Sequence, residues 1–288
     1  MKYKRIAAGM NLLILLLPAA GCRTTPPVSV GEIEAVFQTR LTTDPAERIW
    51  RQAPVYPVPL LLQDIVEPRL LEPSTQEVRV QAVHDGSSVA LRLEWKDPSR
   101  DDRPGPGLFA DACAIQFPAL REGDLPAPQM GEAERAVEIT YWSAFWQASI
   151  DGRPDDIQAL YPGASVDHYP FEAPSLEPGS TEQLEMADLY SPARSLENSM
   201  AGPRSRPVQD LLAEGPGTLV PAGEASSDGR GVYTGEGWSV ILLRPLPVDL
   251  PSGARLQVAV AVWDGSQKEV GARKMRSGWI PLLIQEEK

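Results

Sequence analysis

Residues 237–283 read GWSVILLRPLPVDLPSGARLQVAVAVWDGSQKEVGARKMRSGWIPLL, and this stretch decides the fold class. From Trp238 to Leu243, and again from Leu256 to Val262, two sets of side chains alternate residue by residue. Alternation over this length predicts β-strands. Asp264-Gly265, directly after the second strand, predicts a turn. We therefore expect two strands here, then a turn and the segment that holds Lys274.

The same kind of pattern recurs upstream. We expect strands at 55–62, 78–82, 89–95, 111–117 and 137–150, the last one bending after Trp142. Pro57 and Pro59 favour an edge position for the first of these strands, because proline cannot donate to a neighbouring strand. His84-Asp85-Gly86 is typical of a hairpin turn between the second and third strands.

The 288 residues include 29 prolines and 23 glycines, which predict many turns and long loops. The region 151–231 is dominated by Pro, Gly, Ser, Glu and Asp, and we expect a long loop there with one short helix at 207–213. The resulting fold class is all-β: an antiparallel β-sandwich of about eight to ten strands with long Pro/Gly-rich loops.

The N-terminus has the features of an export signal. Lys2, Lys4 and Arg5 precede an apolar run that is too short to span a bilayer, and Ala19-Ala20-Gly21-Cys22 resembles the lipobox of bacterial lipoproteins. We expect a signal peptide at 1–21, a tether at 22–45 carrying lipid on Cys22, and one domain at 46–288. The expected location is the periplasmic face of a bacterial membrane. The alternative is an ordinary signal peptide cleaved near Gly21, with Cys22 incidental.

Composition and motifs exclude several functions. A net charge of −12 makes nucleic acid a poor partner, because phosphate contacts need Lys and Arg. The two histidines, His84 in a turn where solvent exposure is expected and His168 in the long loop, are too few for zinc chemistry. The sequence has no G-x-S-x-G motif or P-loop. It has no C-x-x-C-H, which excludes a covalently attached c-type haem. With Cys113 as the only cysteine besides Cys22, we expect no intramolecular disulfide.

Several short pieces, individually weak, form an ordered set along the chain. They are 80–95, Asp111–Pro118, Pro128–Gly131, Tyr161-Pro162, Asp167–Pro170, Gly237–Val240, Arg244–Leu246, Ala261–Gly265, Lys274 and Trp279. This set resembles the haem b-binding γ subunits of ethylbenzene dehydrogenase, dimethylsulfide dehydrogenase, selenate reductase and (per)chlorate reductase. The resemblance covers most of residues 46–285.

The resemblance implies a b-type haem whose iron has one methionine and one lysine as axial ligands. Carried over by motif, these residues are Met130 and Lys274. A lysine binds a metal only as the neutral amine, and we expect burial, Arg273 and Arg276 to lower the pKa of Lys274. Lys268 is the nearest rival lysine. Met186 and Met200 lie in a loop that is longer here than is usual in the family.

The resemblance further implies a non-catalytic electron-transfer subunit. Its expected partners are a molybdenum-containing catalytic subunit, an iron–sulfur subunit and an external carrier such as cytochrome c. The alternative is a haem-free β-sandwich lipoprotein, similar to DOMON or carbohydrate-binding modules, in which Trp142 or Trp146 stacks on sugar.

Overall fold

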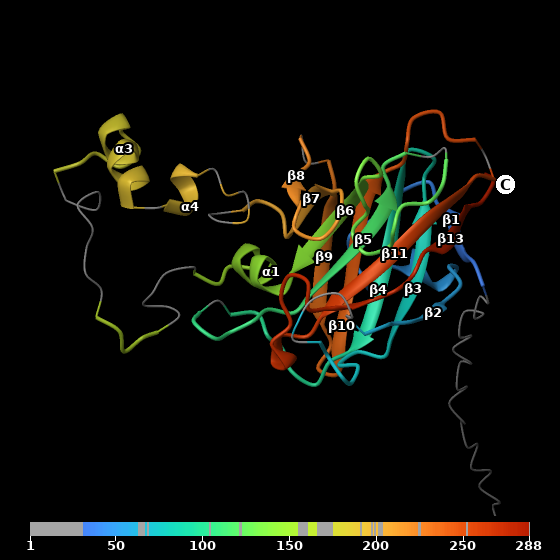
Figure 1. Ribbon diagram of the computed structural model, residues 1–288, viewed down its shortest axis with the longest axis horizontal. Helices are drawn as coiled ribbons and strands as arrows, with labels where there is room; N and C mark the ends of the chain where they lie inside the picture. Colours follow the sequence, from blue (N-terminus) through green and yellow to red (C-terminus); the bar gives the residue numbers. More distant parts are fainter. Residues whose placement is uncertain are drawn as a thin grey trace, which may run out of the picture.

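The computed structural model describes residues 31–287, apart from 63–66, 68, 104, 121–122, 155–160, 166–174, 191, 197, 199, 201–203, 224–225 and 252. Two predicted residues, Cys22 and His168, lie outside the described part. The described strands form one continuous hydrogen-bonded sheet in the order β8-β7-β6-β5-β11-β13-β1-β3-β4-β10-β9, with β12 beside β11 and β2 beside β3 (Figure 1).

The sheet folds into two layers that share β11 (Arg255–Trp263). Residues 255–258 of β11 pair with β13 (Ile280–Ile284), while residues 259–263 pair with β5 (Ala112–Pro118). The first layer adds β1 (Ile33–Phe37), β2 (Tyr56–Pro59), β3 (Glu77–His84), β4 (Ser88–Lys96), β10 (Gly237–Pro245) and β9 (Asp228–Tyr233). The second layer adds β6 (Val137–Ser143), β7 (Val208–Ala213), β8 (Val220–Pro221) and β12 (Met275–Arg276).

The main core lies between the two layers. Leu91 and Val240 from the first layer meet Ile115, Trp142 and Val260 from the second in one buried cluster. Along β5 and β11 the alternate residues point the other way, to the outer face of the second layer. The all-β sandwich is therefore confirmed, with thirteen described strands where we expected about eight to ten.

Not every strand pair is antiparallel, and the domain begins earlier than we expected. β1 lies inside the expected tether 22–45, yet it pairs in parallel with both β13 and β3. Its side chains Ile33 and Ala35 are buried in the core. A tether ending at residue 45 is thus wrong, because residues 33–37 are a central strand of the first layer.

Two further predictions fail near the second layer. The expected helix at 207–213 is the strand β7, which pairs with β6 on one side and β8 on the other. The expected strand 137–150, predicted to bend after Trp142, is confirmed as far as Ser143 in β6, but residues 144–150 form the helix α1 (Ala144–Ile150) and not a continuing strand. The region 151–231 also contains the helices α3 (Thr181–Tyr190) and α4 (Pro192–Ser195), which lie to the side of the sandwich (Figure 1).

His84 is buried instead of exposed, at 3% of its accessible surface. It ends β3 and packs edge-to-face on Phe37 of β1, with ring centroids 5.6 Å apart. Its Nδ1 accepts a hydrogen bond from Gly86 N, and burial lowers the pKa of the ring. The hairpin turn itself is confirmed. Exposure fails because β1 covers this end of β3.

Candidate functional site

The outer face of the second layer has a floor of small side chains. Ala114 of β5 and Ala261 of β11 are directly paired across the strands, and Ala259 follows at the next outward position. Ile139 of β6 and Leu211 of β7 continue this floor. Because alanine projects only one carbon, the floor is flat and apolar, and it lies at the bottom of a cavity of about 480 Å³.

Aromatic rings form one wall of this cavity. Tyr141 of β6 stands edge-to-face between Trp263 and Trp146, with centroids 5.3 Å from each ring. The guanidinium of Arg204 stacks over Trp146, 3.6 Å from its centroid. These contacts fix the rings, since edge-to-face pairs and stacked cations are favourable arrangements.

Met130 closes the cavity from the loop between β5 and β6. It has a positive φ of 74°, which is uncommon for a residue other than glycine. Gly131 follows at φ 79°, where an added Cβ would lie 2.8 Å from Arg135 O and 2.9 Å from Ala213 O. Gly215 N donates to Met130 O at 2.8 Å. The backbone therefore fixes the position from which the Met130 side chain projects.

Two side chains outside the loop hold its beginning. Trp279 Nε1 donates to Pro126 O at 2.6 Å, and Gln116 Nε2 donates to Pro128 O at 2.7 Å. Both acceptors precede Met130 by only a few residues. A loop that would otherwise be free to move is thus attached to β5 and to the chain just before β13.

Lys274 approaches from the opposite side, on the segment between β11 and β12. Its Nζ lies 5.3 Å from the ring centroid of Trp263 and 3.5 Å from Gly271 O. Trp263 Nε1 donates to the same Gly271 carbonyl at 3.0 Å, which holds this segment close to the cavity wall.

The two predicted ligand residues meet at the cavity. Lys274 Nζ donates to Met130 Sδ at 3.4 Å, although the residues are 144 positions apart in sequence. Burial, and then the charge of Arg276, lower the pKa of Lys274 to about 8. Our prediction that Arg276 lowers this pKa is confirmed, whereas Arg273 is not among the groups that act on Lys274. An amine with this pKa is partly neutral near pH 7–8, as a metal ligand must be.

The other predicted residues lie elsewhere, with one exception. Lys268 is exposed in a left-handed conformation at the end of the short 3-10 helix η3 (Gly265–Gln267). Cys113 is a buried free thiol on the inner face of β5. Met200, which we had put aside with the divergent loop, lines the cavity and is 40% exposed. No pattern in the sequence pointed to Met200.

The two tryptophans that the carbohydrate-binding alternative requires are not available to a sugar. Trp142 is fully buried in the main core, and Trp146 is 5% exposed beneath Arg204. Stacking on a sugar needs an exposed ring face, so the idea that these tryptophans are exposed is wrong.

The donor set and the floor suit a haem. A thioether is a soft ligand and a neutral amine is a nitrogen ligand, and together they can take both axial positions of a haem iron. The apolar cavity above the alanine, Ile139 and Leu211 floor leaves space next to both predicted ligand residues for an apolar group. Met130 and Lys274 would hold the iron, and their side chains would have to separate from the present contact of 3.4 Å to do so.

No helix within the described residues is both long and apolar enough to cross a membrane.

A family model described as ethylbenzene dehydrogenase matches residues 47–275. This range includes both Met130 and Lys274, and it covers well over half of the chain.

Three relatives are haem or γ subunits by name. The chain is 24% identical to "Putative respiratory nitrate reductase heme subunit ORF7" of Haloferax mediterranei, over 95% of this chain and 80% of that protein. It is 25% identical to the chlorate reductase subunit gamma of Ideonella dechloratans, over 83% and 78%. It is 30% identical to the dimethylsulfide dehydrogenase subunit gamma of Rhodovulum sulfidophilum, over 44% of this chain and half of that protein.

Among solved structures, a carbohydrate-binding module of family 9 from Caldicellulosiruptor kristjanssonii, in complex with cellotriose, aligns over 89% of this chain and 94% of its own. The TM-score is 0.41 and the sequences are 7% identical.

Proposed function

This chain belongs to the ethylbenzene dehydrogenase family, and from that premise we propose that it is a haem-binding γ subunit that relays electrons within a multi-subunit oxidoreductase complex. The names of the relatives in two reductases and a dehydrogenase support this role. The observation that carries the proposal is the meeting of Lys274 Nζ and Met130 Sδ at 3.4 Å beside an apolar cavity.

We further propose that the haem is of the b type and that Met130 and Lys274 are its axial ligands. When bound, the haem supplies a one-electron couple at its iron. Met130 contributes a thioether, which favours the reduced metal and raises its potential. Lys274 contributes its amine once the proton has left, and the lowered pKa reduces the cost of that loss. Trp263 and the Gly271 carbonyl orient the amine.

With both Met130 and Lys274 binding the iron, a haem held here would have no position free for a substrate. The chain therefore acts as a relay and carries no substrate chemistry itself. We propose that its partners are a molybdenum-containing catalytic subunit and an iron–sulfur subunit, with cytochrome c or a similar protein as the external carrier.

The location is proposed from the sequence alone. The basic N-terminus, the short apolar run and Cys22 after small residues support export and lipid attachment at Cys22. The tether then extends to about residue 32, because β1 begins at Ile33.

Absorption spectra of the purified full chain, oxidised and dithionite-reduced, test the ligands. We compare wild type with Met130→Ala and Lys274→Ala, and use Met200→Ala and Lys268→Ala as matched controls. The expected result is a b-type, six-coordinate spectrum in the wild type and both controls. In Met130→Ala and Lys274→Ala we expect a high-spin spectrum or loss of haem.

Other outcomes contradict different parts of the proposal. A spectrum changed by Met200→Ala and not by Met130→Ala would move the thioether ligand to the second methionine at the cavity. A spectrum that survives both Met130→Ala and Lys274→Ala would refute the ligand pair. No haem in the wild type, even after reconstitution, would refute the electron-transfer role.

A further inference from the structure

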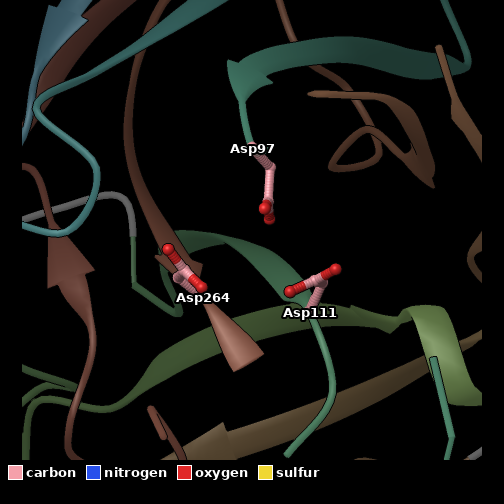
Figure 2. Close-up of side chains that lie close together, drawn as sticks. All are labelled: Asp97, Asp111 and Asp264. Carbon is pink, nitrogen blue, oxygen red and sulfur yellow. The ribbon is translucent and has the colours of Figure 1, made fainter. Parts of the chain in front are cut away.

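Three buried carboxylates meet at one end of the sandwich, outside the cavity described above. Asp97 directly follows β4, Asp111 directly precedes β5, and Asp264 directly follows β11. Their ligand-competent oxygens all lie within 4.8 Å of one another, and the residues are 1%, 0% and 6% exposed. Figure 2 shows the Asp97 carboxylate pointing toward the space between the other two.

Asp111 accepts hydrogen bonds on both carboxylate oxygens, from two backbone N–H groups and one indole N–H group. Gly265 N donates to its Oδ1 at 2.9 Å, while Asp101 N and Trp238 Nε1 donate to its Oδ2 at 2.8 and 2.9 Å. Gly265 is required here, because a Cβ would lie 2.2 Å from Phe109 O. Three N–H donors on one carboxylate favour its charged form.

One carboxylate oxygen of Asp97 faces the Asp111 carboxylate and has no hydrogen-bond donor. Its Oδ1 accepts from Ser99 N at 3.1 Å, but its buried Oδ2 accepts no hydrogen bond. A buried carboxylate oxygen without a donor is costly. The space that it faces holds two more carboxylates, so the missing partner is either a proton on one of them or a cation.

The charges around Asp97 are of one sign. Burial, and then the charges of Asp264 and Asp101, both acidic, raise the pKa of Asp97. A hydrogen bond from Ser99 N and one shared with the Asp111 side chain act to lower it. Burial is also the largest cause that raises the pKa of Asp111, to about 7, and the charge of Asp97 adds to it. Three carboxylates this close and this buried are compatible only with bound protons or with a cation.

We propose that Asp97, Asp111 and Asp264 bind one Ca²⁺ ion. Oxygens that bind a common Ca²⁺ at about 2.4 Å lie at most about 4.8 Å apart, which the observed separations satisfy. Ca²⁺ takes about six to eight oxygens in flexible geometry, so waters or further oxygens would complete its shell, whereas Mg²⁺ fits less well because it needs near-ideal octahedral geometry.

The ion would join the ends of three strands from both layers. β4 belongs to the first layer and β5 to the second, and β11 is shared. Asp264 also begins the segment that leads to Lys274, where its Oδ1 accepts from Ser266 Oγ and Gln267 N. We therefore expect Ca²⁺ to stabilise the whole sandwich and the start of this segment.

Calorimetric titration of CaCl₂ into the EDTA-stripped full chain tests the site, together with thermal unfolding in CaCl₂ or MgCl₂. We expect one Ca²⁺ per chain, a higher melting temperature in Ca²⁺ and a smaller effect of Mg²⁺. Asp97→Asn keeps the shape and removes one charge, so it should weaken Ca²⁺ binding roughly tenfold or more, because affinity follows ligand charge. Asp249→Asn is the matched control, since this exposed turn residue at φ 61° tolerates asparagine.

The rival explanation is a proton shared between Asp97 and Asp111. It predicts no Ca²⁺ heat in the stripped wild type and an Asp97→Asn variant that is at least as stable as wild type, and that result overturns the proposal. Affinity unchanged in both Asp97→Asn and Asp264→Asn would place the ion elsewhere and overturn it too. If Asp97→Asn fails to fold, Asp264→Asn and the wild-type titration decide. The test does not depend on haem, so it can fail separately from the proposed function.

Discussion

Replacing Lys274 by methionine should stabilise the haem-free protein at neutral pH. The pKa of Lys274 falls from its ordinary value of 10.5 to about 8, because the ammonium is buried near Arg276. At about 1.4 kcal/mol per pKa unit, the folded state then carries a penalty of roughly 3 kcal/mol for holding the charged form. Because the side chain is partly exposed, we expect about 1–2 kcal/mol after solvent screening.

The penalty has a defined pH window. Below pH 8 the amine is protonated in both the folded and the unfolded chain, so the penalty is fully present. Between pH 8 and 10.5 the folded state has lost the proton while the unfolded state still holds it, so wild-type stability rises with pH relative to the variant. Above pH 10.5 the amine is neutral in both states and the penalty is gone.

The assay is urea unfolding of haem-free wild type, Lys274→Met and Lys268→Met at pH 7.0, 8.5 and 10. Lys268 is the matched control because its side chain is exposed. Its left-handed backbone conformation affects lysine and methionine alike, so the substitution changes only an exposed charge. The difference in unfolding free energy between wild type and Lys274→Met should shrink as pH rises, while that for Lys268→Met should stay constant. Parallel pH profiles for wild type and Lys274→Met would refute the reasoning, because they mean a solvated amine with an ordinary pKa.

Three more predictions concern the methionine loop and the N-terminus. Gly131→Ala combines a φ of 79° with a Cβ 2.8 Å from Arg135 O, so it should cost about 1–3 kcal/mol in urea unfolding and lower the haem content. Gly152→Ala, at φ 100° in open space, controls for the positive φ alone. Trp279→Phe removes the donor to Pro126 O and should lower the free energy of unfolding by about 1 kcal/mol. It should also change the absorption spectrum of the reduced haem protein, because the loop that carries Met130 loses this hydrogen bond. An unchanged spectrum would mean that this hydrogen bond is not needed to position Met130. Cys22→Ser should abolish labelling by radioactive palmitate and release the protein from membranes, and persistent membrane attachment would contradict lipid attachment at Cys22.

The strands that could be predicted from sequence are those with long alternation, such as β3, β4, β10 and β11. The strand β7 was missed because Val208, Leu211 and Leu212 have the spacing of a helix face. Pairing with β6 and β8 on both sides overrides this local preference. The strand β1 was missed because its partners are parallel and one of them, β13, lies near the other end of the chain. No local pattern reports such a pairing.

Part of the candidate site could likewise be predicted from the sequence, and part could not. Met130 and Lys274 came from the ordered family resemblance, and neither residue stands out by spacing or composition. Because β5 and β11 are antiparallel, the loops that follow them leave from opposite ends of the pair, and Met130 and Lys274 meet only because both loops fold back over its outer face. The cluster of buried carboxylates, in contrast, could not be predicted from the sequence by any route. The cluster joins residues up to 167 positions apart, Asp97 and Asp264 being the most distant pair.

The position of the cavity on the outer face of the sandwich is itself an argument for electron relay. The space between the layers is filled by large side chains such as Trp142 and Leu91, so a planar group held by Met130 and Lys274 must lie on the outer face of the second layer. The residues at the cavity mouth include Val270, Met200 and Leu219, which are 57%, 40% and 41% exposed. Exposed apolar groups of this kind are typical of surfaces that contact another protein. A haem bound on this floor would therefore lie close to the surface that a partner subunit can approach, as the short distances of electron transfer require.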